Sequence, residues 1–126
     1  MSKTKGIRAE RELIHLFWAT PDWIAARIAG SGSMRYPAPD IIAGNDERKL
    51  VIEAKISKDP RIYIPRAEIE ALLIFAAKFR AQALLAYRFD RQDWKFIAPE
   101  HCEHTDKHYV ITTTTRGISF DDMIIT

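Results

Sequence analysis

The sequence predicts an α/β protein with a mixed central β-sheet flanked by helices, and three observations support this class. Apolar residues recur at helical spacing near the start of the chain and again over residues 65–80. Short runs rich in Ile, Val and Ala lie between and after these stretches, separated by Gly, Asn, Asp and Pro. A short helix is expected over residues 119–125. Helices at both ends of a mixed sheet indicate an α/β sandwich.

Each element is predicted from its periodicity and from the residues that bound it. Ile7, Ile14 and Phe17 recur at helical spacing in the first helix, and Pro21 helps to end it. Pro65 suits the first turn of the second helix, because its fixed φ fits there and its missing N–H costs nothing. The elements expected in chain order are a helix at 4–19, strands at 23–29, 40–43 and 50–56, a helix at 65–80, strands at 83–89 and 94–98, a candidate strand at 109–112 and the helix at 119–125.

Length and composition narrow the class of protein further. The chain has 126 residues, of which 47% are apolar and 29% charged, so we expect one globular domain over residues 1–126. No apolar run approaches the roughly 18 residues of a membrane helix, and we expect no membrane partner. A single cysteine cannot form an internal disulfide, which excludes a disulfide-stapled secreted module and favours a reducing, cytoplasmic location.

Positive charge is concentrated in the first half of the chain. Lys and Arg number 19 against 17 Asp and Glu, a net charge of +2. Residues 1–35 carry +3 and residues 48–66 carry +4, whereas residues 100–126 carry −3. Two basic blocks suit a polyanionic partner, because each neutralised phosphate releases counterions. A solvated charged surface with no such partner is the alternative.

The strand at 50–56 combines an apolar face with a charged one. Side chains alternate faces along a strand, so the even-numbered residues share an apolar face, while Val51, Glu53 and Lys55 share the other. A carboxylate and an ammonium side by side at mid-strand are unusual in so apolar a sequence. They indicate a site, with the wet face of an antiparallel sheet as the alternative.

A second carboxylate is expected beside this pair. Asp40 follows Pro39 at the head of its strand, and the hairpin closed by the turn at 44–49 returns the chain so that Asp40 lies near Glu53. Two oxygen ligands from adjacent strands can hold a hard cation such as Mg²⁺. Lys55 can steady an attacking water or offset charge growing on a phosphate. These are the parts of metal-assisted phosphodiester hydrolysis.

Glu10 is a third candidate carboxylate. It lies three residues after Ile7 and four before Ile14, on the expected buried stripe of the first helix. An acid on that side of a helix needs a partner. The partner is either the metal shell, reached directly or through water, or a salt bridge to Arg27 or Lys55.

These residues occur in a recognisable sequence pattern. Pro39-Asp40, a gap of twelve residues and then Glu53-Ala54-Lys55 matches the PD-(D/E)xK nuclease pattern. The context is more specific, namely KGIRAEREL at 5–13, RIAGSGS at 27–33, PDIIAGN at 39–45 and IEAK at 52–55. Their order and spacing resemble the archaeal Holliday-junction resolvase (Hjc) family. The resemblance covers nearly the whole chain, with a looser match over 99–126.

The resemblance implies a restriction-endonuclease-like fold, a homodimer, and Mg²⁺-dependent cleavage of two opposed strands in a four-way DNA junction, with Mn²⁺ as a substitute. The residues that match its catalytic set are Glu10, Asp40, Glu53 and Lys55, with Ser31 or Ser33 in a loop that carries a functional serine in some members. Phe75 and Phe79 match aromatics of its dimer interface. Arg11 and Arg27 match basic residues important for activity or DNA contact, and Arg88 falls where the family places a basic residue on the following strand.

We therefore expect a junction-resolving endonuclease that has no small-molecule substrate and recognises DNA by shape, because phosphate contacts position without reading sequence. The candidate phosphate contacts are Lys3, Lys5, Arg8, Arg11, Arg27, Arg35, Lys58, Arg61, Arg66 and Arg88. Two alternatives remain open: another PD-(D/E)xK nuclease acting on duplex or flap DNA, and a DNA-binding module without catalysis.

Several aromatic and metal-binding residue types have a simpler structural interpretation. Phe75 and Phe79 lie one helical turn apart, a spacing that without the resemblance favours core packing. Tyr63 could stack on DNA or pack on the sheet. Core positions are expected for Trp18, Trp23 and Trp94. A polar loop is favoured over a zinc site for His101, Cys102, His104 and His108, because the paired ligand spacing typical of zinc sites is missing.

Overall fold

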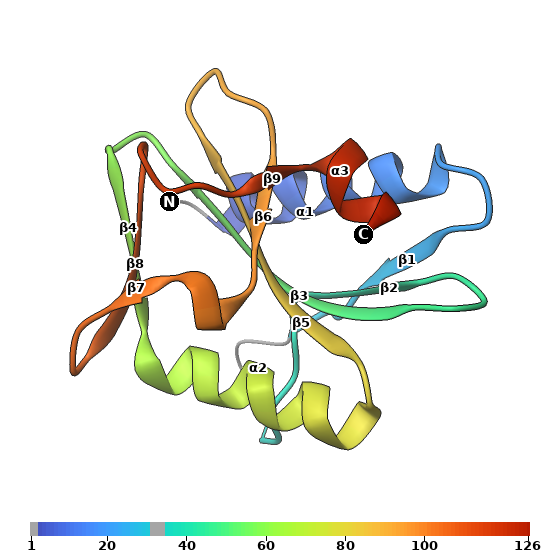
Figure 1. The fold of residues 1–126 in the computed structure, drawn as a ribbon, viewed down its shortest axis with the longest axis horizontal. Coiled ribbons are helices and arrows are strands. Elements are labelled where there is room, and N and C mark those ends of the chain that lie inside the picture. The colour runs from blue at the N-terminus through green and yellow to red at the C-terminus, as the bar shows by residue number, and fades with distance from the viewer. Residues whose placement is uncertain (1–2, 31–34) are drawn as a thin grey trace.

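The computed structural model describes residues 3–30 and 35–126, and its centre is a mixed β-sheet with helices on both faces (Figure 1). The sheet has the strand order β1-β2-β3-β5-β6-β9. Its members are β1 (Ile24–Arg27), β2 (Ile41–Gly44), β3 (Lys49–Ser57), β5 (Gln82–Phe89), β6 (Lys95–Ile97) and β9 (Ile118–Ser119). Only β3 and β5 pair in parallel among these neighbours.

The parallel pair requires a crossover, which the segment between β3 and β5 provides. It contains β4 (Arg61–Pro65) and α2 (Arg66–Phe79). β4 leaves the central sheet and begins a second sheet of order β4-β8-β7, with β8 (His108–Thr112) and β7 (Glu103–His104). A short 3₁₀ turn, η2 (Pro99–His101), links the two sheets.

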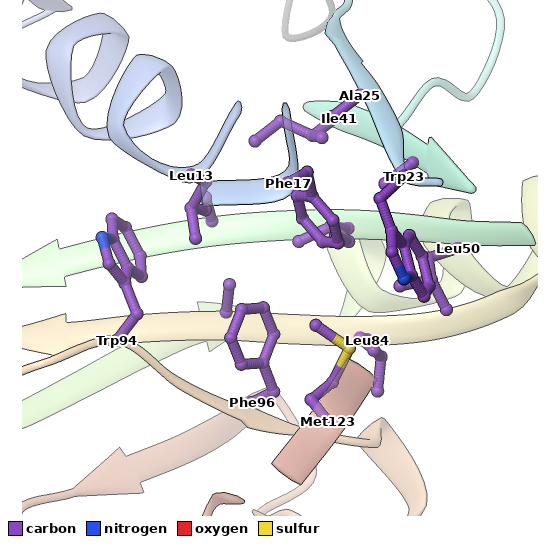
Figure 2. Close-up of a cluster of buried hydrophobic side chains, with 14 of the residues drawn as sticks. Leu13, Phe17, Trp23, Ala25, Ile41, Leu50, Leu84, Trp94, Phe96 and Met123 are labelled. Atoms are coloured by element: carbon purple, nitrogen blue, oxygen red, sulfur yellow. The ribbon is translucent and has the colours of Figure 1, made fainter. Parts of the chain in front are cut away.

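The helices divide between the two faces of the central sheet. α1 (Lys3–Trp18) and α3 (Phe120–Ile125) cover one face, and α2 covers the other (Figure 1). The core under α1 and α3 includes Leu13, Phe17, Ile41, Leu50, Phe96 and Met123 (Figure 2). The core under α2 includes Val51, Ile64, Ile69, Leu72, Leu85 and Ile111. None of the helices over residues 3–30 and 35–126 is long and apolar enough to span a membrane.

The predicted α/β class is confirmed, and the first helix, the strands around residues 41–57 and the terminal helix lie where the sequence places them. The prediction missed β4 and put Pro65 inside the second helix, whereas Pro65 ends β4 and caps α2. β4 is an edge strand, where a residue without an N–H is tolerated. The two-residue strands β7 and β9 are too short to produce a periodic signal.

The buried stripe of α1 is shifted from the predicted one. Ala9, Leu13 and Phe17 are buried, whereas Ile14 is only partly buried. The expected core position of Trp18 is wrong: it is 59% exposed, and its indole N–H donates to the carbonyl of Ala25 at 2.9 Å. Trp23 and Trp94 are buried as expected.

Candidate active site

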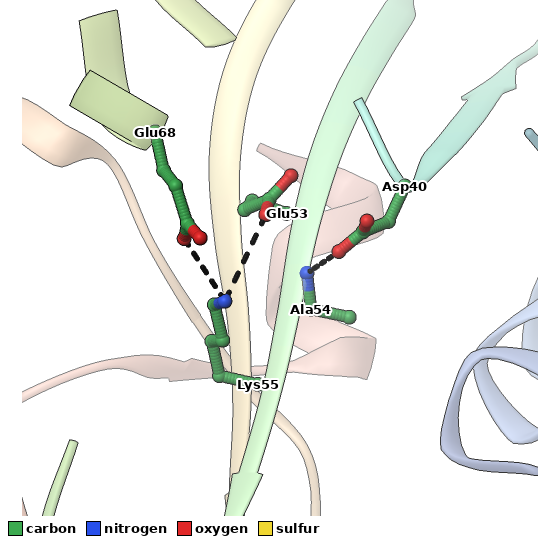
Figure 3. A network of polar contacts seen from close by, with 5 residues as sticks. All are labelled: Asp40, Glu53, Ala54, Lys55 and Glu68. Atoms are coloured by element: carbon green, nitrogen blue, oxygen red, sulfur yellow. Dashed lines mark hydrogen bonds and ion pairs between the residues drawn. The ribbon is translucent and has the colours of Figure 1, made fainter. Parts of the chain in front are cut away.

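The β2–β3 hairpin places Asp40 beside Glu53, as the sequence predicts. Ile41 pairs with Ile52, so Asp40, one residue before β2, lies level with Glu53 of β3. The backbone N–H of Asp40 donates to the carbonyl of Ile52 at 3.1 Å. In return, Asp40 Oδ2 accepts the N–H of Ala54 at 3.0 Å (Figure 3). The ladder and the carboxylate together fix the position of Asp40 against β3.

Glu53 and Lys55 project from the same face of β3, toward α2. The side chain of Glu53 is only 13% exposed, and that of Lys55 is 26% exposed. Lys55 Nζ lies 3.9 Å from Glu53 Oε2 and 3.0 Å from Glu68 Oε2, in the first turn of α2 (Figure 3). The ammonium is therefore held between two carboxylates.

The acids of this site repel one another in a poorly hydrated place. Burial, followed by the charge of Asp40, raises the pKa of Glu53 from 4.5 to about 8. Burial lowers the pKa of Lys55, but the hydrogen bond and charge of Glu68, with the charges of Glu53 and Asp40, outweigh it, so that this pKa is raised overall. The site thus holds a protonated Lys55 ammonium beside carboxylates whose negative charge it does not fully neutralise.

Glu10 belongs to the same electrostatic neighbourhood but has its own partner. Its Oε1 lies 3.9 Å from Arg27 Nη1, so the salt bridge that the sequence left open as an alternative is present. Burial and the charge of Asp40 raise the pKa of Glu10 to about 7, while Arg27 and Lys55 act in the opposite direction. The charges of Asp40 and Lys55 therefore both affect the pKa of Glu10, which lies on α1.

The donor set fits a hard divalent cation at Asp40 and Glu53. Within residues 3–30 and 35–126, no group of three His, Cys, Asp or Glu side chains is arranged to hold a metal ion. Two carboxylates suffice for Mg²⁺, which usually keeps several waters and adds substrate phosphate oxygens. A cation there would also relieve the mutual repulsion that raises the pKa of Glu53.

The candidate phosphate contacts fall into several groups. A groove of about 590 Å³ beside α1 is lined by four of them, Lys5, Arg8, Lys58 and Arg88. Arg88 also pairs with Glu12 at 2.9 Å. Near the groove, the neighbouring ammonium of Lys58 lowers the pKa of Lys5, so two cations approach each other closely.

The other candidate cations are more scattered. Arg66 is engaged with the β7–β8 turn, where it donates to the carbonyls of Thr105 at 2.6 Å and Asp106 at 2.9 Å. Arg61 donates to the hydroxyl of Tyr63, which is exposed. Arg11 is exposed on α1, and Arg35 is exposed at the start of the second described range. Ser31 and Ser33 lie outside the described residues, as does the side chain of Lys3.

The aromatic pair of α2 lies at the edge of the core. Phe75 is partly buried against the core under α2, whereas Phe79, which meets it edge to face at 5.7 Å, is 41% exposed. Leu73 and Ile74, earlier on α2, are exposed too. Lys49 lies over the ring of Phe79 at 4.5 Å. The exposed side chains of Leu73, Ile74 and Phe79 form what we call the α2 surface.

His104 and Cys102, two of the candidate zinc ligands, have local partners. His104 Nδ1 lies 3.1 Å from Arg66 Nη2. The buried Cys102 donates its S–H to the carbonyl of Val110 at 3.3 Å. Burial raises the pKa of this thiol, which makes it less reactive.

Sequence reasoning missed Glu68. No motif includes it, and its position on α2 relative to β3 depends on the path of the crossover. The only sequence signal was an acid in the first turn of a helix that follows the motif lysine.

A central mixed sheet with a Glu–x–Lys pair on one strand, and an Asp just before the adjacent strand, defines a class, the restriction-endonuclease-like nucleases of the PD-(D/E)xK type. Comparison with known proteins narrows this class. A family model described as archaeal Holliday junction resolvase (Hjc) matches residues 1–126. The chain therefore belongs to the archaeal Holliday junction resolvase family.

Individual relatives agree with this assignment. The crossover junction endodeoxyribonuclease Hjc of Archaeoglobus fulgidus is 39% identical over 109 residues, covering 86% of this chain and 79% of that protein. Hjc of Methanocaldococcus jannaschii is 32% identical over 117 residues, covering 93% and 83%. A solved structure of A. fulgidus Hjc, described as a Holliday junction resolvase, superposes with a TM-score of 0.86 at 34% identity, covering 93% of this chain and 96% of the other.

Proposed function

We propose that this chain resolves four-way DNA junctions by Mg²⁺-dependent hydrolysis of phosphodiester bonds, acting as a homodimer of single nuclease domains. Its family makes it a crossover junction endonuclease. The observation that carries the chemistry is the bond from the Ala54 N–H to Asp40 Oδ2, because it fixes one carboxylate against the strand that bears Glu53 and Lys55. The DNA substrate favours a cytoplasmic location.

Each residue of the site has a separate task. Asp40 and Glu53 would hold Mg²⁺, with Mn²⁺ as a substitute. When bound, such an ion supplies activation of water and stabilisation of the leaving oxygen. Lys55 Nζ orients the attacking water or offsets charge on the phosphate. Glu10 supports the site electrostatically from α1, held by Arg27.

The remaining assignments are the loop serine and the residues that would contact DNA. Ser31 or Ser33, both outside the described residues, is assigned a role in cleavage from the family pattern. The DNA backbone would run along the groove beside α1, where phosphates would contact Lys5, Arg8, Lys58 and Arg88. Arg11, Arg27, Arg35, Arg61 and Arg66 are the further candidate contacts.

The α2 surface is the proposed dimer interface. An isologous contact presents two identical sites to a symmetric junction. Phe79→Ala should shift the protein toward monomer in sedimentation experiments, because it removes an exposed ring from the α2 surface. Ile125→Ala, a change at an exposed apolar residue of α3, is the matched control and should leave the dimer intact. A dimer unaffected by Phe79→Ala would place the interface elsewhere.

Junction selectivity separates this function from the alternatives. A synthetic immobile four-way junction is incubated with the protein and Mg²⁺, and the products are resolved on a denaturing gel. We expect cuts in two opposed strands that persist under excess linear duplex. Equal competition by linear duplex would favour another PD-(D/E)xK nuclease, and binding without cleavage in Mg²⁺ or Mn²⁺ would favour a DNA-binding module.

A further inference from the structure

The carboxylate nearest to the motif lysine does not belong to the motif. Lys55 Nζ is 3.0 Å from Glu68 Oε2, but 3.9 Å from Glu53 Oε2, its neighbour on β3 (Figure 3). A charge-assisted contact at 3.0 Å restricts a long side chain that otherwise has several rotamers. Glu68 thus selects the direction in which Lys55 extends.

The two carboxylates approach Lys55 from different elements. Glu53 lies next to it on β3 and is nearly buried, whereas Glu68 comes from the first turn of α2 and is 43% exposed. α2 is fixed on the sheet by the buried Ile69 and Leu72. Glu68 therefore stands on a rigid support, one residue before the first buried anchor of the helix.

We propose that Glu68 is a positioning residue for the hydrolytic reaction, holding the Lys55 ammonium beside Glu53. This inference rests on the proposed function. Without Glu68, the contact with Glu53 at 3.9 Å is the one ion pair left to this ammonium within residues 3–30 and 35–126. Lys55 would then spend part of its time turned away from the reacting phosphate.

The role predicts a loss in the chemical step and not in binding. Glu68 is partly exposed and packs in neither core, so Glu68→Gln should fold normally. We expect the single-turnover cleavage rate at saturating protein to fall about tenfold, since small misplacements of a reacting group are costly. The dissociation constant for the junction should not change. Glu68→Asp should recover part of the loss, because it keeps the charge.

Glu70→Gln is the matched control. Glu70 is exposed on the same helix, but a residue two positions along a helix faces another direction. It should cleave at the parental rate. Equal losses in Glu68→Gln and Glu70→Gln would point to general charge on α2 and would overturn the inference.

A double-mutant test ties the effect to Lys55. In a Lys55→Ala background, Glu68→Gln should cause no further loss of rate, because the group that it positions is gone. A tenfold loss that persists in that background would overturn the inference, as would parental cleavage by Glu68→Gln while Lys55→Ala is slow. If Lys55→Ala itself cleaves normally, or if the parent does not cleave, the proposed function fails together with the inference.

Discussion

The two faces of β3 bury very different side chains. On the face toward α1 and α3, Leu50, Ile52 and Ala54 belong to the buried apolar core. On the face toward α2, apolar packing extends through Val51 and then gives way to Glu53 and Lys55. One strand thus carries the hydrophobic support of the hairpin and the charged groups of the candidate site.

The difference shows how the fold holds a costly site. Burying a carboxylate beside another acid is unfavourable, as the raised pKa of Glu53 indicates. The opposite face of the same strand contributes apolar burial that offsets this cost. Changes on the α2 face should therefore alter chemistry, and changes on the α1 face should alter stability.

The largest effect is expected for Asp40→Asn. The amide oxygen can still accept the N–H of Ala54, so the hairpin should remain, but an anionic ligand is lost. We expect junction cleavage to slow at least a thousandfold, about 4 kcal/mol in the barrier, with binding retained. Single-turnover assays measure this, with Asp46→Asn in the exposed hairpin turn as the control. Cleavage by Asp40→Asn at the parental rate would remove Asp40 from the mechanism.

A smaller effect is expected in the pH dependence of stability without metal. Folded Glu53 keeps its proton up to about pH 8, whereas in the unfolded chain the pKa returns to 4.5. The free energy of unfolding should therefore fall as pH rises between these values and level off above them. Glu10, whose pKa is raised to about 7, adds a slope of the same sign.

Glu53→Gln removes one titrating group and should flatten most of this slope. At pH 8 it should be more stable than the parent, because it has no buried carboxylate that loses its proton on unfolding. Urea unfolding in EDTA at several pH values measures the difference. If the free energy of unfolding depends on pH identically in parent and variant, the pKa of Glu53 is not raised in the folded protein.

The smallest effect concerns the opposite face. Ile52→Val removes one buried methylene, and we expect a loss of about 1 kcal/mol in the free energy of unfolding. The cleavage rate at a temperature where both proteins are folded should not change. A slower cleavage reaction with unchanged stability would contradict the assignment of stability to the α1 face of β3 and of chemistry to its α2 face.

Local pattern was enough to predict the hairpin and its acids. Alternation in β3, the turn at 44–49 and the spacing from Asp40 to Glu53 together set the register, and the structure has this register. Such features are local, because a strand alternates and a short turn fixes its partner.

What depends on tertiary packing could not be predicted in the same way. Glu68 reaches Lys55 only because the crossover through β4 places α2 over that face of β3. The spacing of Phe75 and Phe79 is the same for a core pair and for a surface pair, so exposure had to come from the structure. The salt bridge of Glu10 likewise depends on tertiary packing, because its partner Arg27 lies at the end of β1.

The central claim is that Asp40 and Glu53 hold a divalent ion beside Lys55. Anomalous scattering from crystals grown with Mn²⁺ tests it most directly, because the ion can be located independently of activity. We predict one strong peak in contact with carboxylate oxygens of both Asp40 and Glu53. A well-occupied peak bound elsewhere, or no peak at these oxygens in crystals of active protein, would contradict the claim.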